Sequence, residues 1–463
     1  MNRRNFIQAA GCGSMSLLPF MSSLLSLNKL NAAAGSALNS ANNDYRALVC
    51  ILLAGGNDSF NMLVPRGATE HATYANTRSN LALPIESIVP ISQTLQTGLD
   101  LGIHPAMTEM KQLYDQGKLA FLANVGTLIE PTTLPDVISE NARLPVGLFS
   151  HADQIQQWQT SVPQDRAAIG WGGKMADLLN AMNENQRISM NISLSGNNVF
   201  QSGQQTIEYT INPAVGGAET IYGYNEEGIF EQIQTSAINN LLEQQYQNIF
   251  QQTYANTIRQ SIDSNEEFAN AITNLPPLMT AFSDNELSTN LNMIARTIAA
   301  RDTLNFRRQT FFVVYGDWDH HDEVINAHAA GMSVVSRALG EFQTAMEELG
   351  VADCVTTFGI SDFARTATSN GNGSDHGWGG HVFAMGDAVN GGEVYGLYPE
   401  VGIQTSLDVG GGVYIPTTST DEYFAELALW MGVSPTDLPL VLPNIGNFYS
   451  PGSPNLPIGF MNV

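Results

Sequence analysis

The stretch ALVCILLAGGND, residues 47–58, joins eight apolar residues to a pair of glycines and, after an asparagine, an acid. A run of this length without polar alternation is typical of a strand buried on both faces, as in a parallel sheet. The glycines predict a tight turn where the strand ends. Asp58 therefore follows the carboxyl end of a buried strand, which is where ligands bind in open α/β sheets.

Further apolar runs bounded by turn residues predict more buried strands, at residues 119–125, 188–194, 311–315, 354–360 and 382–385. Helical spacing of apolar residues lies between some of them, for example across residues 328–349. We therefore expect an α/β fold with a mostly parallel central sheet covered by helices on both faces.

One segment, at about residues 220–300, does not show this alternation of predicted strands and helices. It is a Gln- and Asn-rich insertion. Its apolar residues recur near helical spacing from 229 to 272, which predicts long amphipathic helices. We expect these helices to pack on the main core; capping the active face and forming an oligomer surface are the alternatives. No Pro- or Gly-rich linker divides residues 45–463, so a single domain is expected there.

The bulk composition excludes several classes of protein. Hydrophobic residues make up 43% of the 463 and charged residues 14%, which is typical of a globular chain. The formal net charge of −25 repels phosphate backbones, so nucleic acid is not an expected partner.

Residues 1–34 resemble a twin-arginine signal peptide, with Arg3 and Arg4 ahead of a moderately apolar stretch and three alanines at 32–34. We expect a periplasmic or secreted protein that engages the twin-arginine export machinery. The alternatives are an amphipathic structural helix or, through Cys12, a lipoprotein. Cys50 and Cys354 lie in apolar runs and are expected to be buried thiols, with a disulfide as the alternative.

Five of the eight histidines crowd into two stretches, GDWDHHDEVINAH at 316–328 and GSDHGWGGH at 373–381. Each stretch follows a predicted strand. Carboxylates combined with neutral imidazoles suit zinc, manganese or iron, so we expect one or two divalent transition-metal ions, with zinc or manganese preferred. Taken singly, each stretch also fits a solvated loop or a turn.

The motifs LLAGGNDSFNMLVP (52–65), FSHADQIQQW (149–158), GDWDHH (316–321), SDFART (361–366) and DHGWGGH (375–381) resemble, in this order, a known family. It is the twin-arginine-exported bacterial family called domain of unknown function 1501, placed in the alkaline phosphatase-like superfamily. The resemblance implies a two-metal site with the ions about 4 Å apart.

The resemblance also assigns residues to that site. Asp58 would bind one ion together with Asp375 and His376. The second ion would be bound by Asp319, His321 and His381. The superfamily often spaces the acid and histidine of the second site four apart, which fits Asp317 instead of Asp319, so both remain candidates.

A nucleophile at a helix N-terminus is also implied, because the free N–H groups there favour an anion. Ser150 meets this description, although it fits an ordinary helix N-cap equally well. Ser59 is a second candidate. Arg365 could contact a substrate oxyanion through its guanidinium or form a structural salt bridge.

These inferences favour an exported metal-dependent hydrolase of a phosphate or sulfate ester, acting on an anionic small molecule or polysaccharide. The alternative is a non-enzymatic exported protein that keeps the fold and serves in envelope or polysaccharide assembly with a second exported protein. No C/S-x-P-x-R motif occurs, so a formylglycine sulfatase is not expected. No G-x-S-x-G elbow or P-loop occurs either, which disfavours serine-hydrolase and nucleotide-binding functions.

Overall fold

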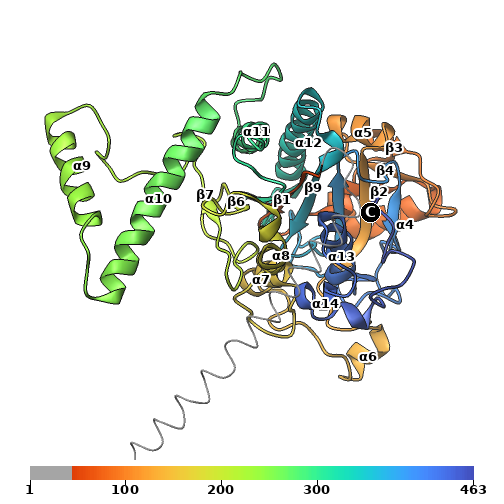
Figure 1. The fold of residues 1–463 in the computed structure, drawn as a ribbon. Helices are drawn as coiled ribbons and strands as arrows, with labels where there is room; N and C mark the ends of the chain where they lie inside the picture. Colours follow the sequence, from red (N-terminus) through yellow and green to blue (C-terminus); the bar gives the residue numbers. More distant parts are fainter. Residues whose placement is uncertain (1–43) are drawn as a thin grey trace, which may run out of the picture.

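The computed structural model describes residues 44–463, and a twisted sheet runs through the middle of this part of the chain (Figure 1). The strand order is β11-β5-β10-β9-β1-β8-β6-β7, with β12 pairing with β5 outside this path. The strands of this sheet are β1 (Arg46–Leu53), β5 (Leu119–Gly126), β6 (Asn191–Ser193), β7 (Tyr209–Thr210), β8 (Arg308–Tyr315), β9 (Val355–Ser361), β10 (Gly380–Met385), β11 (Val394–Gly396) and β12 (Thr418–Ser419).

The centre of the sheet is parallel, since β1 pairs with β8 on one side and with β9 on the other in the same direction. Every residue of β1 from Ala47 to Leu53 is buried, as its uninterrupted apolar sequence predicts. Strand β10 is the exception, because it runs antiparallel between β5 and β9. The expected fold class, an α/β protein with a mostly parallel sheet, is confirmed.

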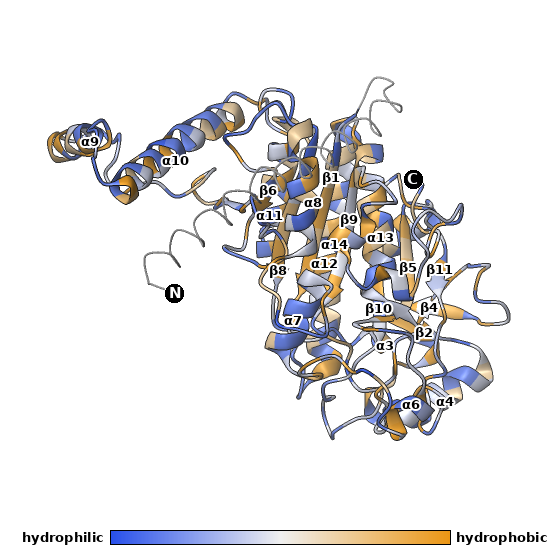
Figure 2. Ribbon diagram, turned by 60° about the horizontal axis from the view of Figure 1, so that its bottom comes forward, coloured by the Kyte–Doolittle hydropathy of each residue, from blue (hydrophilic) through white to orange (hydrophobic). Residues whose placement is uncertain are grey.

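Helices cover both faces of the sheet. One layer contains α5 (Thr108–Asp115), α11 (Glu286–Ala299) and α12 (Val324–Glu348), which pack on one another and on β5 and β8. The other contains α7 (His151–Thr160), α8 (Trp171–Leu179), α13 (Thr420–Met431) and α14 (Leu438–Val441), which contact β1, β5, β6 and β9 (Figures 1 and 2).

A small second sheet and several short helices complete the fold. The second sheet has the order β2-β4-β3 and is antiparallel, with β2 at Leu63–Pro65, β3 at Val89–Ile91 and β4 at Leu101–Ile103. The remaining helices of this region are α3 (Ser59–Met62), α4 (Ala68–Arg78) and α6 (Leu134–Ile138).

Most predicted strands match observed ones within two or three residues, but the run at 188–194 does not form a strand over its whole length. Only Asn191–Ser193 pairs with β8. The N–H of Ile188 donates to the Asn185 side chain instead of to a neighbouring strand. Ile188 and Met190 are nevertheless buried, so this apolar run reflects burial more than sheet pairing.

The two long helices predicted in the Gln- and Asn-rich insertion are present as α9 (Ile229–Leu242) and α10 (Ile249–Thr273). The expectation that they pack on the main core is wrong for α9, which has no buried residue. The pair projects away from the sheet, and only the C-terminal half of α10 returns to it through Phe268 and Ile272 (Figure 1). An amphipathic pattern specifies an apolar face but not the surface that covers it.

The predicted signal peptide and Cys12 lie outside the described residues. Cys50 and Cys354 are both buried and no disulfide joins them, as expected. Within residues 44–463, none of the helices has the length and apolar character needed to cross a membrane.

Candidate metal centre

The functional residues gather where the three central strands end. The register of β1 aligns Leu53 with Tyr315 of β8 and with Ser361 of β9, so all three strands end at the same level. The loops that follow them therefore meet at one edge of the sheet. Because β10 is antiparallel to β9, the loop that leads into it arrives at this edge too. The N-terminus of α7 contributes one more side chain, His151.

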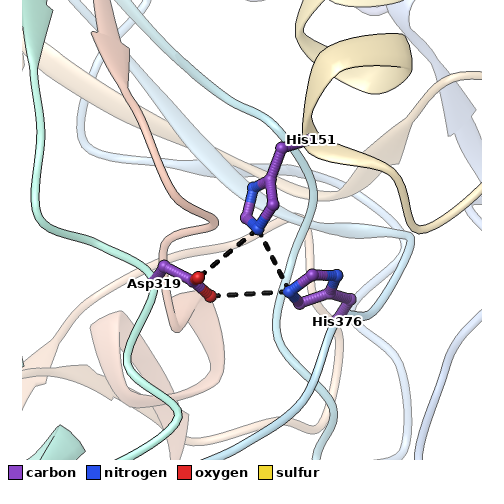
Figure 3. A group of neighbouring side chains, drawn as sticks. All are labelled: His151, Asp319 and His376. Carbon is purple, nitrogen blue, oxygen red and sulfur yellow. Dashed lines mark hydrogen bonds and ion pairs between the residues drawn. The ribbon is translucent and has the colours of Figure 1, made fainter.

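His151, Asp319 and His376 converge at this edge, each from a different segment (Figure 3). The Nε2 atoms of the two histidines are 3.1 Å apart. Each also lies 3.5 Å from a carboxylate oxygen of Asp319. In a tetrahedral zinc site with bonds of about 2.0–2.1 Å, ligand atoms are separated by roughly 3.3–3.4 Å. The three side chains thus have the spacing of ligands around one ion.

The other ring nitrogens of the two histidines make hydrogen bonds that determine their tautomers. His376 Nδ1 lies 2.8 Å from the carbonyl oxygen of Phe149, which can only accept, so Nδ1 carries the proton. His151 Nδ1 lies 2.6 Å from the carboxylate of Asp362 and donates to it in the same way. In the neutral rings both Nε2 atoms are then unprotonated, and two acceptors at hydrogen-bonding distance cannot bond to each other.

A cation between these atoms would resolve that conflict. Metal-binding histidines almost always donate their other N–H to a carboxylate or a backbone carbonyl, which is the arrangement of both rings here. Burial lowers the pKa of His376, which favours the neutral form that a metal requires. The donor set of imidazole and carboxylate is one that suits a divalent transition metal.

His321 and Asp375 lie beside the three convergent residues and are exposed. His321 Nε2 is 3.0 Å from His376 Nε2 and 3.0 Å from Asp319 Oδ1, while its Nδ1 is 3.2 Å from Asp375. Bonding to the Asn370 amide and to His321 lowers the pKa of Asp375. These two side chains extend the cluster of donor atoms towards solvent.

Arg365 lies beneath the exposed cluster, on its buried side, and bonds Asp319. Its buried guanidinium donates to Asp319 Oδ1 at 2.5 Å and also contacts the carbonyl oxygens of Gly55 and Ser374. Burial by itself would raise the pKa of Asp319, but the hydrogen bond and charge of Arg365 outweigh it, so this pKa is lowered. Arg365 therefore forms a salt bridge with Asp319, which was one of its two expected roles. Its side chain is fully buried.

Two backbone features, at Phe149 before α7 and at Gly55 after β1, position the residues of this cluster. Phe149 adopts a φ of 73°, uncommon for a bulky residue, and from this conformation its carbonyl accepts the His376 proton. Gly55 has a φ of +121°, and a Cβ there would lie 2.4 Å from the backbone nitrogen of Asp319. The glycine turn predicted after the first strand is thus required for the close approach of the Asp319 loop.

Asp58 and His381 have their contacts elsewhere. Asp58 is fully buried and forms an ion pair with Arg78. His381 stacks on Tyr398 with the ring centroids 4.9 Å apart, and burial lowers its pKa to about 3. Asp58 Oδ1 and His381 Nε2 nevertheless lack hydrogen-bond partners in the buried interior. The Asn124 backbone N–H donates to His381 Nδ1, so the neutral ring carries its proton on Nε2 and presents no lone pair there.

Ser150 caps α7, because its hydroxyl accepts the backbone N–H of Asp153 at 3.4 Å. The next residue, His151, was not singled out from the sequence, and neither was Asp362. Both lie inside quoted motifs, FSHADQIQQW and SDFART. A histidine directly after a helix cap, and an acid directly after a strand, were the available signals.

Comparison with known protein families confirms the family resemblance, but it does not identify an activity. The model described as "Protein of unknown function (DUF1501)" matches residues 45–410. No curated protein matches significantly.

Solved structures show distant similarity. Ps i-CgsB in complex with k-i-k-neocarrahexaose is 10% identical, with 84% of this chain and 72% of that chain covered and a TM-score of 0.35. PsFucS1 sulfatase from Pseudoalteromonas sp. is 9% identical, with 88% and 71% covered and a TM-score of 0.35. The lipoteichoic acid synthase LtaP from Listeria monocytogenes is 8% identical, with 82% and 74% covered and a TM-score of 0.31. At sequence identities and TM-scores this low, these similarities carry no argument about function, which has to be inferred from the geometry of the site.

Proposed function

The chain belongs to this family of proteins of unknown function, and we propose that it is an exported metal-dependent hydrolase of a phosphate or sulfate ester. The observation that carries the proposal is the convergence of His151, Asp319 and His376, with both outer ring nitrogens donating to oxygen acceptors. Half-exposed donor atoms at the carboxyl edge of the sheet leave room for a substrate.

The ligand set that we propose is His151, Asp319 and His376 for one ion, with His321 and Asp375 beside it for a second. A bound divalent ion supplies Lewis-acid polarisation of an ester oxygen. The surroundings require such an ion for anion binding, because Asp319, Asp375 and Asp362 would otherwise repel a phosphate or sulfate group.

The remaining residues act on the ligands or on the substrate. Arg365 holds the Asp319 carboxylate in place, and Asp362 holds the ring of His151, so both are positioning residues. Ser150 is our proposed nucleophile, because it lies at the N-terminus of α7 directly before the ligand His151. Its hydroxyl already accepts the Asp153 N–H, which orients the lone pairs but leaves its proton available to donate.

Metal analysis of the purified chain tests the metal centre. We expect one or two equivalents of zinc or manganese in the wild type, and loss of most of it in His376→Ala. His71→Ala is the matched control, because His71 bonds only the carbonyl of Leu83, far along the chain from the site. Wild-type protein that stays metal-free after incubation with zinc and with manganese would refute the metal centre.

Turnover of aryl phosphates, phosphodiesters and aryl sulfates by the metal-loaded protein tests the reaction. Ser150→Ala should abolish turnover, but it also removes the helix cap, at a cost of about 0.5–2 kcal/mol. Ser150→Asn keeps a capping side chain without the hydroxyl and separates the two effects. Full activity of Ser150→Asn would exclude Ser150 as the nucleophile.

A second function, in envelope or polysaccharide assembly without catalysis, is favoured by the carboxylates of Asp319, Asp362 and Asp375 around the site, which repel an anionic ester unless a metal is bound. A fully metal-loaded protein that turns over none of these esters would favour this function over hydrolysis.

A further inference from the structure

The outer part of the helix pair carries seven large apolar side chains that are more than half exposed. We define the helical arm as residues 229–258, which comprise α9 and the first part of α10. Phe230 and Phe250 are 83% and 82% exposed. The other large apolar side chains of the arm that are more than half exposed are Ile229, Ile233, Leu241, Ile249 and Tyr254.

Each helix of the arm has a second apolar face besides the one that holds the pair together. Helices α9 and α10 contact each other, and Ile238 and Leu242 of α9 are half-buried. Ile233 and Leu241 lie two turns apart on α9 and remain exposed, as do Phe250 and Tyr254 one turn apart on α10. A helix with apolar residues on two sides is typical of a helix inside a larger bundle.

The charge of the arm indicates what covers it. Glu231 and Glu243 are the only acidic or basic residues between 229 and 258, and Arg259, which follows directly, donates to Asn239 of α9, whereas the whole chain has a net charge of −25. The absence of Lys and Arg between 229 and 258 argues against an anionic membrane surface, which attracts basic amphipathic helices. Two copies of so acidic a chain meet with least repulsion at this nearly neutral surface.

The area is sufficient for a dimer. A large buried apolar side chain removes on the order of 100–200 Å² from solvent, so the seven side chains of the arm offer roughly 700–1,400 Å² per copy. A stable interface needs about 800 Å² per partner. Single chains rarely leave an apolar surface of this size exposed.

We propose that the helical arm is the dimerisation element of this protein, in which the hairpins of two copies pack around a two-fold axis as a four-helix bundle. A symmetric interface places the same residues on both sides, so Phe230 and Phe250 of each copy enter the shared core. The contact lies on the arm and does not involve the metal centre, so the proposal is independent of the proposed function.

Sedimentation velocity and light scattering of the full mature chain at about 1–50 μM test this. The wild type should be a dimer. Phe230→Glu and Phe250→Glu should each weaken dimerisation at least about 30-fold, since a central aromatic side chain is replaced by a charge. The matched control is Ile403→Glu, which alters a side chain that is 57% exposed outside the arm and should leave the dimer unchanged.

Folding and competing partners are separable in the same experiment. Residues 230 and 250 are exposed, so both variants should keep the wild-type circular dichroism and metal content. A monomeric wild type overturns the proposal, as does a dimer that persists in Phe230→Glu/Phe250→Glu. Binding of a monomeric wild type to vesicles of phosphatidylcholine and phosphatidylglycerol (1:1), lost in the double variant, would assign the arm to a membrane instead.

Discussion

Asp362→Asn probes the metal centre without touching a proposed ligand. Asp362 accepts two hydrogen bonds, one from the Gly55 N–H at 3.0 Å and one from His151 Nδ1 at 2.6 Å. An asparagine has one acceptor oxygen and one donor nitrogen. If its oxygen faces Gly55, its NH₂ group forces the proton of His151 onto Nε2, which removes the lone pair from the site. If its oxygen faces His151, the NH₂ group opposes the Gly55 N–H.

The expected loss follows from this conflict. Removing a hydrogen-bonding partner of a metal-binding histidine typically weakens metal affinity 10–100-fold, or by about 1.4–2.7 kcal/mol. The loss of one charge-assisted hydrogen bond, worth about 1.5–3 kcal/mol, agrees with this range. Competition between the protein and a chromophoric chelator for zinc measures the affinity directly.

A buried carboxylate outside the site provides the control. Asp421 is fully buried and accepts a hydrogen bond from the Ser161 hydroxyl at 2.9 Å. Asp421→Asn should leave zinc affinity within about twofold of the wild type. If a folded Asp362→Asn variant also binds zinc within twofold of the wild type, Asp362 does not set the tautomer of His151 and the argument for a metal at this position fails.

Three further outcomes are expected. Asp58→Asn should lower the free energy of unfolding by about 3–5 kcal/mol in urea titrations, because it leaves the buried charge of Arg78 unpaired. The double variant Asp58→Asn/Arg78→Met should recover part of the lost stability. A loss of metal without a loss of stability would instead identify Asp58 as a ligand. Burial raises the pKa of Asp421 to about 7, so the folded state holds its proton more tightly and the stability this contributes is complete below about pH 4 and lost as the pH rises through 7. Between pH 4 and 8 the free energy of unfolding of the wild type should therefore fall by up to about 4 kcal/mol relative to that of Asp421→Asn. If urea unfolding gives the same dependence of this free energy on pH for both proteins, the expectation is contradicted. Gly55→Ala should weaken zinc binding at least about 10-fold in the chelator assay, because its Cβ would displace the Asp319 backbone; unchanged affinity would show that the loop yields without cost.

The strands of the central sheet were predictable because parallel strands are buried on both faces and leave uninterrupted apolar runs. The same signal places Asp319, His321, Asp375 and His376 near one another, since loops after parallel strands meet at one edge of the sheet. The run at 188–194 misled for the same reason: it is buried, but its backbone pairs with a neighbouring strand only at Asn191–Ser193.

His151 could not be recognised as a partner of this group from its surroundings. It does not follow a strand, and it reaches the site from the first turn of helix α7. Asp58 shows the opposite case, since it follows a strand as expected but turns inward to Arg78. The local sequence predicts where a loop begins but not which way each side chain on it points.

By itself the sequence determined the fold class, the buried strands, the two long helices of the insertion and most of the donor residues, because hydrophobic periodicity and turn residues act locally along the chain. Only the tertiary structure decided which donors share a centre, which ring nitrogens face it and which helices remain uncovered. These depend on packing between segments that are 54 to 225 residues apart in the sequence, where the choice among alternative contacts is made by burial and hydrogen bonding in the whole fold.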